Sequence, residues 1–166
     1  MAKLLELSAP PTPGVRATTR GNPGHLSIDL DVTPGAVPIV RTIVRAHLTL
    51  WGLSGLNDRV ALTVSELLTN VVRHVAADVR TGAPSARLTV TRLPGALNVC
   101  VRDASLALPQ LSYADLDAEA GRGLSLVMAY ADYCGSSPVS GGKDVWANFL
   151  ISDSDTSERG RGQAAS

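Results

Sequence analysis

The spacing of the apolar residues changes several times along this chain, and the order of the changes limits the folds that it can adopt. Residues 26–32 alternate strictly between apolar and polar, which predicts a half-buried strand. Two segments with apolar residues three and four positions apart follow, at 37–51 and 57–78, and they predict amphipathic helices. Pro38 falls in the first turn of the earlier helix, where its missing N–H costs nothing, and Asn57 is a possible cap of the later one.

The second half of the chain returns to a spacing of two. Alternating residues around Pro94-Gly95 predict a hairpin over 88–101, and a second hairpin is expected over 133–151. Between them, residues 104–121 are expected to be a long loop, with a helix following Gly123. This order lacks the βαβ repeat of a parallel sheet. It predicts an α+β fold, an α/β sandwich in which a mixed, mostly antiparallel sheet has its helices packed on one face.

Length and local composition predict one domain with irregular ends. The chain has 166 residues, of which 45% are hydrophobic, enough for a single core. Residues 1–23 contain repeated Pro and Gly without a periodic apolar pattern, so we expect a flexible leader. Residues 152–166 are polar and rich in Gly and Ser, and we expect a disordered tail. The folded body is then 24–151.

Charge and hydropathy argue against several classes of protein. The 15 Lys and Arg balance the 15 Asp and Glu, whereas a general nucleic-acid binder is normally basic. No apolar run approaches the roughly 20 residues needed to cross a bilayer, and the N-terminus lacks the pattern of a secretory signal. Cys100 and Cys134 lack metal-ligand spacing, and we expect two small buried hydrophobes in a reducing, cytoplasmic setting.

The polar side of the second predicted helix carries three groups suited to chemistry. Glu66, Asn70 and His74 lie four residues apart, and each step of four turns only about 40° around a helix, so they share one face. A carboxylate can accept a proton, an amide oxygen can bind a hard cation, and an imidazole can donate to a phosphate. Spacing alone also fits an ordinary solvated helix face.

Two further positions could contribute to the same site. Asp103 ends an alternating strand and could present its carboxylate to a pocket, although it could equally begin a turn. Gly121-Arg122-Gly123-Leu124 joins the long loop to a helix, where free N–H groups could meet a phosphate, or where the glycines simply form a hinge. The chain contains no P-loop, no Rossmann fingerprint, no nucleophile elbow and no zinc helix.

Five segments occur in an order that resembles a known family. They are Trp51-Gly52-Leu53, LTVSELLTNVVRH (62–74), VRDAS (101–105), GRGLSLV (121–127) and GGKDVW (141–146). Together they resemble the bacterial anti-sigma-factor serine/threonine kinases of the GHKL superfamily, the histidine-kinase-like ATPases with the Bergerat fold. The resemblance spans about residues 24–151, and the ELLTNxxxH segment is its most specific part.

The resemblance implies roles on the helix and on the first strand that follows it. Glu66 matches the acidic general base, Asn70 matches the residue whose side-chain oxygen binds Mg²⁺, and His74 matches a residue near the nucleotide. Asp103 matches the aspartate that accepts a hydrogen bond from the adenine amino group, and Ser105 lies in the same nucleotide-binding segment. The implied cofactors are ATP and Mg²⁺.

The loop before the third helix completes the implied site. Gly121 and Gly123 match the second glycine box, in which backbone N–H groups of the Gly121-Arg122-Gly123-Leu124 segment meet phosphates as a helix begins. Residues 106–120 correspond to a lid over the nucleotide. A lid of this kind excludes water and reports occupancy to a partner.

The chain departs from the pattern of the superfamily in three places. The first glycine box has Ser105 where a glycine is usual, although a serine is familiar in the anti-sigma branch. Lys143 and Asp144 follow Gly142, where a threonine often helps to seat the adenine through water. The lid carries three acidic groups: Asp115, Asp117 and Glu119. They would repel a triphosphate unless they point outward or bind Mg²⁺, and they therefore predict a modest nucleotide affinity.

Two functions from different classes fit these residues. The first is an ATP-dependent protein serine/threonine kinase that, by resemblance, binds a sigma factor and phosphorylates a STAS-type anti-anti-sigma partner, with a homodimer possible and no direct contact with nucleic acid or membrane. The second is a non-kinase module whose nucleotide state sets its affinity for a partner. Retention of Glu66 favours the kinase, whereas the changes at Ser105, Lys143 and Asp144 favour the binding module.

Overall fold

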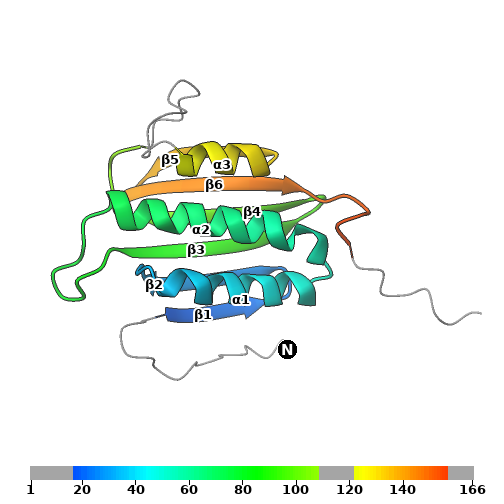
Figure 1. Ribbon diagram of the computed structural model, residues 1–166, viewed down its shortest axis with the longest axis horizontal. Coiled ribbons are helices and arrows are strands. Elements are labelled where there is room, and N and C mark those ends of the chain that lie inside the picture. Colours follow the sequence, from blue (N-terminus) through cyan, green and yellow to red (C-terminus); the bar gives the residue numbers. More distant parts are fainter. Residues whose placement is uncertain (1–16, 109–121, 157–166) are drawn as a thin grey trace, which may run out of the picture.

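The computed structural model describes residues 17–108 and 122–156, which form one open sheet with helices on one face (Figure 1). Strands within these residues follow the order β1-β2-β3-β4-β6-β5, and each neighbouring pair is antiparallel. The strands are β1 (Ala17–Asn22), β2 (His25–Asp31), β3 (Ser85–Leu93), β4 (Ala96–Asp103), β5 (Tyr133–Val139) and β6 (Gly142–Leu150). The helices are α1 (Ala36–Leu50), α2 (Asn57–His74) and α3 (Arg122–Tyr130), with a 3-10 turn, η1 (Ser54–Leu56), before α2.

The predicted α/β sandwich in a single domain is therefore confirmed, and both predicted hairpins are present. The sheet is simpler than expected, because every described strand pair is antiparallel where a mixed sheet was predicted. Gly95 has a φ of +72° in the β3–β4 turn, a conformation that glycine adopts without strain.

The first strand corrects the prediction of a flexible leader over 1–23. Residues Ala17–Asn22 pair along their whole length with β2, and the register closes through a two-residue turn at Pro23 and Gly24. Gly24 supplies the positive φ, +79°, that this turn requires. The segment ATTRGN has no alternating apolar residues because it is an edge strand that is held through its backbone. Residues 1–16 lie outside the described part of the chain.

The helices begin close to where the spacing predicted, but α2 ends early. It stops at His74 instead of Asp78, because Val75 is extended, with φ −103° and ψ 134°. The next residues form a turn in which the Asp78 carboxylate accepts from the backbone N–H of Arg80 at 2.8 Å. Asn57 is not the predicted cap; it is the first residue of α2, which has no side-chain cap bond at its start.

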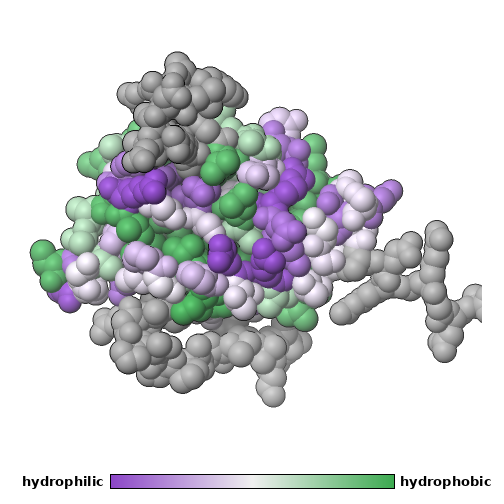
Figure 2. Space-filling view, in the orientation of Figure 1, coloured by the Kyte–Doolittle hydropathy of each residue, from purple (hydrophilic) through white to green (hydrophobic). Residues whose placement is uncertain are grey.

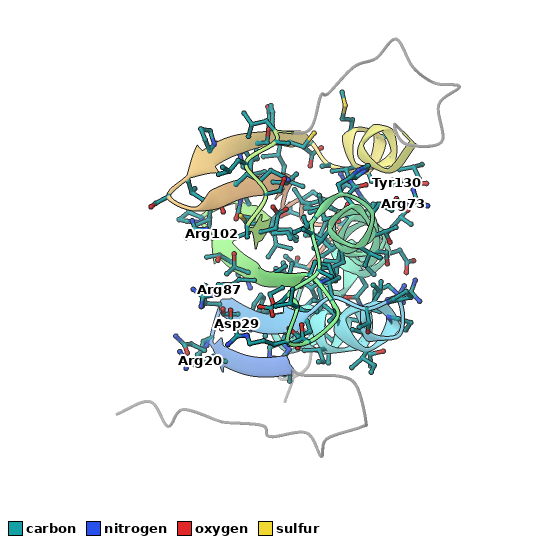
Figure 3. The ribbon with its side chains drawn as sticks, turned by 90° about the vertical axis from the view of Figure 1, so that its left-hand side faces the viewer. Arg20, Asp29, Arg73, Arg87, Arg102 and Tyr130 are labelled. Carbon is teal, nitrogen blue, oxygen red and sulfur yellow. The ribbon has the colours of Figure 1, made fainter. Side chains whose placement is uncertain are left out.

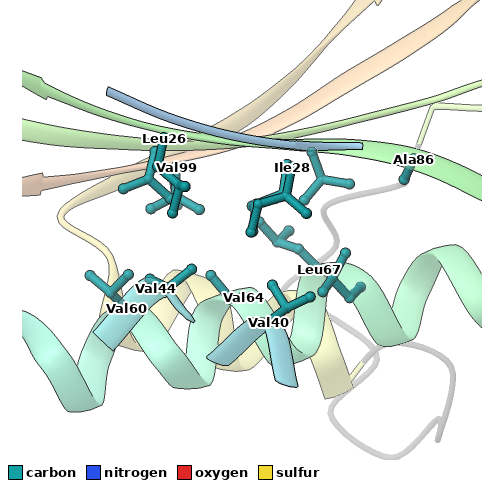
Figure 4. Packing of buried hydrophobic residues seen from close by; sticks show 14 of the residues in the cluster. Leu26, Ile28, Val40, Val44, Val60, Val64, Leu67, Ala86 and Val99 are labelled. Carbon is teal, nitrogen blue, oxygen red and sulfur yellow. The ribbon is translucent and has the colours of Figure 1, made fainter. Parts of the chain in front are cut away.

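The core lies between the sheet and the helix layer. Leu26, Ile28 and Val99 point from the sheet toward Val44 and Val64 of the helices, and all five are fully buried (Figure 4). Burying a side chain of this kind contributes about 1.5–3 kcal/mol. The predicted apolar stripe of α2 therefore holds that helix against the sheet and turns its polar side outward.

An arginine on α2 fixes the far end of α3. The Arg59 guanidinium donates to the carbonyl oxygen of Tyr130 at 2.9 Å and to the Asp132 carboxylate at 3.3 Å. It also lies over the ring of Phe149, 5.3 Å from its centroid, and Asp132 accepts from the N–H of Leu150 at 2.7 Å. These contacts join the start of α2, the end of α3 and the end of β6, and leave the start of α3 at the other end of the sandwich (Figure 1).

The segment after β6 is partly ordered, which corrects the expected disordered tail over 152–166. The Asp155 carboxylate accepts from the backbone N–H of Ser152 at 2.8 Å, and the Asp155 carbonyl accepts from the N–H of Gly55 at 3.2 Å. A Cβ on Gly55 would lie 2.5 Å from the Cα of Asp155, so this approach requires glycine. Residues 157–166 lie outside the described residues.

Neither cysteine is a reactive thiol. Both are free and half-buried, so the expectation of full burial is not met. Burial raises the pKa of the Cys100 thiol to about 11, and burial likewise raises the pKa of Cys134. Over the described residues, the helices are all too short or too polar to cross a bilayer.

Candidate functional site

The three predicted residues of α2 lie on one unbroken helix. Glu66 and Asn70 are half-buried, and His74 is the exposed last residue of α2. They flank the buried stripe that contains Leu67 and Val71. The structure thus places a carboxylate and an amide one turn apart, at the margin between the core and the surface.

The Glu66 carboxyl is partly buried, which changes its acidity. Partial burial raises its pKa above the ordinary value, and the positive charge of Arg73 lowers it by a smaller amount. A raised pKa makes a carboxylate a better proton acceptor near neutral pH. By contrast, the side chain of Asp58 at the start of the same helix is exposed.

Asp103 ends β4 on the side that faces the helices. Strand alternation places it on the same face as Val99 and Val101, and its carboxylate is 3% exposed. Its Oδ1 accepts from the backbone N–H of Ser105 at 2.8 Å and lies 3.2 Å from the Nζ of Lys143. The predicted base-binding carboxylate is therefore buried, oriented and paired with a cation.

The turn after Asp103 forms with Ser105 in the place where a glycine is usual in the superfamily. The bond from the Ser105 N–H to the Asp103 carboxylate is a two-residue side-chain turn, and the Ser105 hydroxyl accepts from the N–H of Ala107 at 3.3 Å. Among the described residues, positive φ values occur only at glycines. Ser105 thus fits this turn without strain, and its hydroxyl is engaged within the turn.

Lys143 is the site residue that the sequence analysis did not assign. It pairs directly with Asp103 in the β4–β6 register, and its side chain is only 7% exposed. The approach depends on Gly142, because a Cβ there would lie 2.9 Å from the carbonyl carbon of Asp103 and 3.1 Å from the Cα of Ala104. The sequence signal was the absence of the threonine that often follows this glycine in the superfamily. The contact itself depends on the register of β4 and β6, which pairs Lys143 with Asp103, 40 residues away in the sequence.

The start of α3 differs slightly from the prediction. The helix begins at Arg122, so Gly123 lies in its first turn and not before the helix. The first N–H groups of a helix have no partner within it and can bind anions. Gly121 and lid residues 109–120, which include Asp115, Asp117 and Glu119, lie outside the described residues, as do the side chains of Arg122 and Leu124.

The fold collects these elements at one edge. The end of α2, the end of β4 and the start of α3 all lie at the left of Figure 1, and Figure 3 looks onto this edge, with the helices on one side and the sheet on the other. The last turn of α2, the buried Asp103 carboxylate and the free N–H groups at the start of α3 therefore share one end of the sandwich. Asn70 precedes the last turn of α2, and Glu66 lies one turn before Asn70. Within residues 17–108 and 122–156, no three His, Cys, Asp or Glu side chains cluster as a metal site.

The outer face of the sheet carries charges of a different kind. An open hollow of about 610 Å³ is lined there by Asp29, Arg87 and Arg102 among others. It extends to Asp103 and Gly142 at the end of β4, whereas Glu66 and Asn70 do not line it. Figure 3 shows Asp29, Arg87 and Arg102 on the side away from the helices. Arg87 pairs with Asp29 at 2.6 Å, and Arg102 with Asp144 at 2.7 Å. These charges form exposed cross-strand pairs on the outer face, and the hollow adjoins the predicted site at Asp103.

A comparison with protein families decides the assignment. The model of the histidine kinase-like ATPase domain matches residues 30–149, well over half of the 166 residues. The chain belongs to the histidine kinase-like ATPase family. The matched segment of this ATPase domain runs from the end of β2 to the end of β6 and includes Glu66, Asn70, Asp103 and Lys143. A comparison with curated proteins finds no match.

Proposed function

We propose that this ATPase-family chain is an ATP-binding anti-sigma regulatory factor with protein serine/threonine kinase activity. The observation that carries the proposal is Glu66: a half-buried carboxyl with a raised pKa, one helical turn from the amide of Asn70. A protein that only binds a nucleotide has no need for a proton acceptor at this position. The family assignment and the order of elements around the edge are consistent with it.

The residues at this edge suit ATP and Mg²⁺. Asp103 is held by Ser105 and Lys143 so that its carboxylate can accept from an amino group of the base. The Asn70 amide oxygen would contribute one ligand to Mg²⁺, and the N–H groups of the first turn of α3 would meet phosphate oxygens. Bound Mg²⁺ neutralises charge on the phosphates.

The proposed reaction needs a hydroxyl from a partner. By family resemblance, the acceptor is proposed to be a serine of a STAS-type anti-anti-sigma protein. Glu66 takes the proton of that hydroxyl as its oxygen bonds to the γ-phosphorus, with ADP as the leaving group. A sigma factor is the proposed target of inhibition, a homodimer is the proposed assembly, and the cytoplasm is the proposed location.

A second candidate is a non-kinase module whose nucleotide state sets its affinity for a partner. It is favoured by the departures from the superfamily pattern at Ser105, Lys143 and Asp144. In this case Glu66 would be a surface carboxylate without a role in proton transfer.

A phosphotransfer assay with labelled ATP and candidate STAS domains distinguishes the two functions. For Glu66→Gln, transfer should fall by about 10²- to 10⁴-fold, because the amide cannot accept the proton, while affinity for ATP changes little. Asp58→Asn is the matched control, because it makes the same chemical change at the exposed start of α2 and should leave transfer unchanged. Wild-type protein that binds ATP but transfers no phosphate would favour the binding module. Transfer by Glu66→Gln at the wild-type rate would remove Glu66 as the base.

A further inference from the structure

The most unusual charge pair in the described structure is buried on the inner face of the sheet. Lys143 and Asp103 lie directly opposite each other on β6 and β4, with side-chain exposures of 7% and 3%. The next pair along the same strands, Arg102 and Asp144, points to the outer face and has exposures of 54% and 18%. The two pairs have the same charges and nearly the same place in the sheet, so burial is what distinguishes them.

Stability alone does not account for the buried pair. Removing both charges from water costs several kcal/mol for each ion, and a buried pair often does no better than apolar residues of the same size. The surroundings would accept such residues, since Val101 and Val145 occupy the next inward positions of the two strands. The pair therefore calls for a role other than packing.

The chemistry of the pair matches one edge of a purine. An ammonium carries three N–H donors, and the contact with Asp103 Oδ1 uses one of them. A carboxylate accepts several hydrogen bonds, so Asp103 can still receive an amino group. A donor beside an acceptor is the complement of adenine, in which the 6-amino group lies next to the ring acceptor N1.

We propose that Lys143 reads the nucleobase, donating from its ammonium to N1 of adenine while Asp103 accepts from the amino group. The inference rests on the proposed ATP binding and adds a specificity-determining residue to it. The tight approach at Gly142 keeps β6 close enough to β4 for both groups to meet the same base. A direct contact from the Lys143 ammonium would also take the place of the threonine hydroxyl that often follows this glycine in the superfamily.

The test alters one atom of the ligand. Affinities for Mg-ATP and Mg-1-deaza-ATP, which lacks only the N1 acceptor, are measured by calorimetry on the wild-type chain. The wild type should bind 1-deaza-ATP about 10- to 100-fold more weakly, the usual loss for a hydrogen bond to a charged group. Lys143→Met keeps the apolar stem without the ammonium and should bind both nucleotides equally. The control Arg102→Met removes a cation from the outer face of β4 and should keep the wild-type difference.

The outcomes separate this inference from the proposed function. Equal wild-type affinities for the two nucleotides, or a difference that persists in Lys143→Met, would overturn the assignment of Lys143 while leaving ATP binding intact. Failure of the wild type to bind either nucleotide would refute the proposed function and this inference with it. If Lys143→Met fails to fold, the comparison of the two ligands on the wild-type chain decides, because it needs no substitution.

Discussion

Gly142→Ala perturbs the closest backbone approach near the proposed site. The added Cβ would overlap the Asp103 carbonyl oxygen, and it would lie 2.9 Å from the carbonyl carbon of Asp103 and 3.1 Å from the Cα of Ala104. Ordinary contacts of a Cβ begin at 3.4 Å, so the strands must separate by about 0.3–0.5 Å at the two carbon atoms and by more at the oxygen. The obstructing atoms belong to the backbone, so no side-chain rotation relieves the clash.

Overpacking of this kind costs about 1–3 kcal/mol, which lowers the Tm of a chain of this size by about 2 to 12 °C. Because Lys143 and Asp103 follow immediately in the register, their 3.2 Å contact should lengthen as well. Thermal unfolding monitored by circular dichroism measures the first effect, and calorimetry with Mg-ATP measures any loss of binding.

Gly35→Ala is the matched control for this substitution. Gly35 has an ordinary φ of −72°, and a Cβ there would meet nothing within 4 Å, so alanine should be neutral or slightly stabilising, by about 0.4–1 kcal/mol. If Gly142→Ala is as stable as Gly35→Ala, the close approach of β6 to Asp103 is refuted, and with it the geometric basis for placing Lys143 at the site.

Three other outcomes are expected. Asn70→Ala should remove the Mg²⁺ dependence of nucleotide binding and leave the Tm nearly unchanged, since the side chain lies at the edge of the core; an unfolded variant would mark Asn70 as structural. Glu66→Gln should be more stable than the wild type at pH 7 and equal to it near pH 3, because burial raises the pKa of Glu66 in the folded state and the wild type loses stability as the pH rises through that pKa. Thermal melts at both pH values measure the difference in stability, and a difference that does not change with pH would contradict the raised pKa. Arg59→Ala should lower the Tm by removing the bonds to Tyr130 and Asp132, and unchanged amide exchange in α3 would argue against a role in fixing that helix.

The periodic parts of the fold followed from local sequence. Strand β2, both helices of the first half and the two hairpins have apolar residues spaced by two or by three and four, and burial of those residues decides the structure. Strand β1 could not be found in this way, because ATTRGN is held by backbone bonds to β2 and not by side-chain burial. The predicted end of α2 was placed too late, at Asp78, because the apolar stripe runs to Val75, whereas Val75 is already extended and a turn at Asp78 follows.

The candidate site was predictable only where it depends on short spacing. Glu66 and Asn70 are set by one helix, and Asp103 by the end of one strand. Lys143 reaches Asp103 through the register of β4 with β6, which depends on the lengths of the intervening segments and on the approach at Gly142. The turn at Ser105 likewise depends on the hydrogen bond from the Ser105 N–H to the Asp103 carboxylate, which stabilises a turn that contains no glycine.

The exposed surface offers little further guidance. On the helix-bearing face, hydrophilic and hydrophobic residues are interspersed (Figure 2). Exposed apolar side chains there include Ile39 and Leu50 of α1 and Leu126 of α3, which lie on different elements. The candidate site therefore remains the edge where α2 and β4 end and α3 begins.

Calorimetric titration with Mg-ATP of the wild type, Asp103→Asn and Asp144→Asn shows whether the nucleotide binds at the helix-facing end of β4. The two variants make the same chemical change on opposite faces of neighbouring strands. The account predicts one nucleotide site in the wild type, a loss of about 10- to 100-fold in Asp103→Asn, and unchanged affinity in Asp144→Asn. Absence of ATP binding in the wild type, or equal affinities of the wild type and Asp103→Asn, would contradict the claim that the nucleotide binds at the helix-facing end of β4.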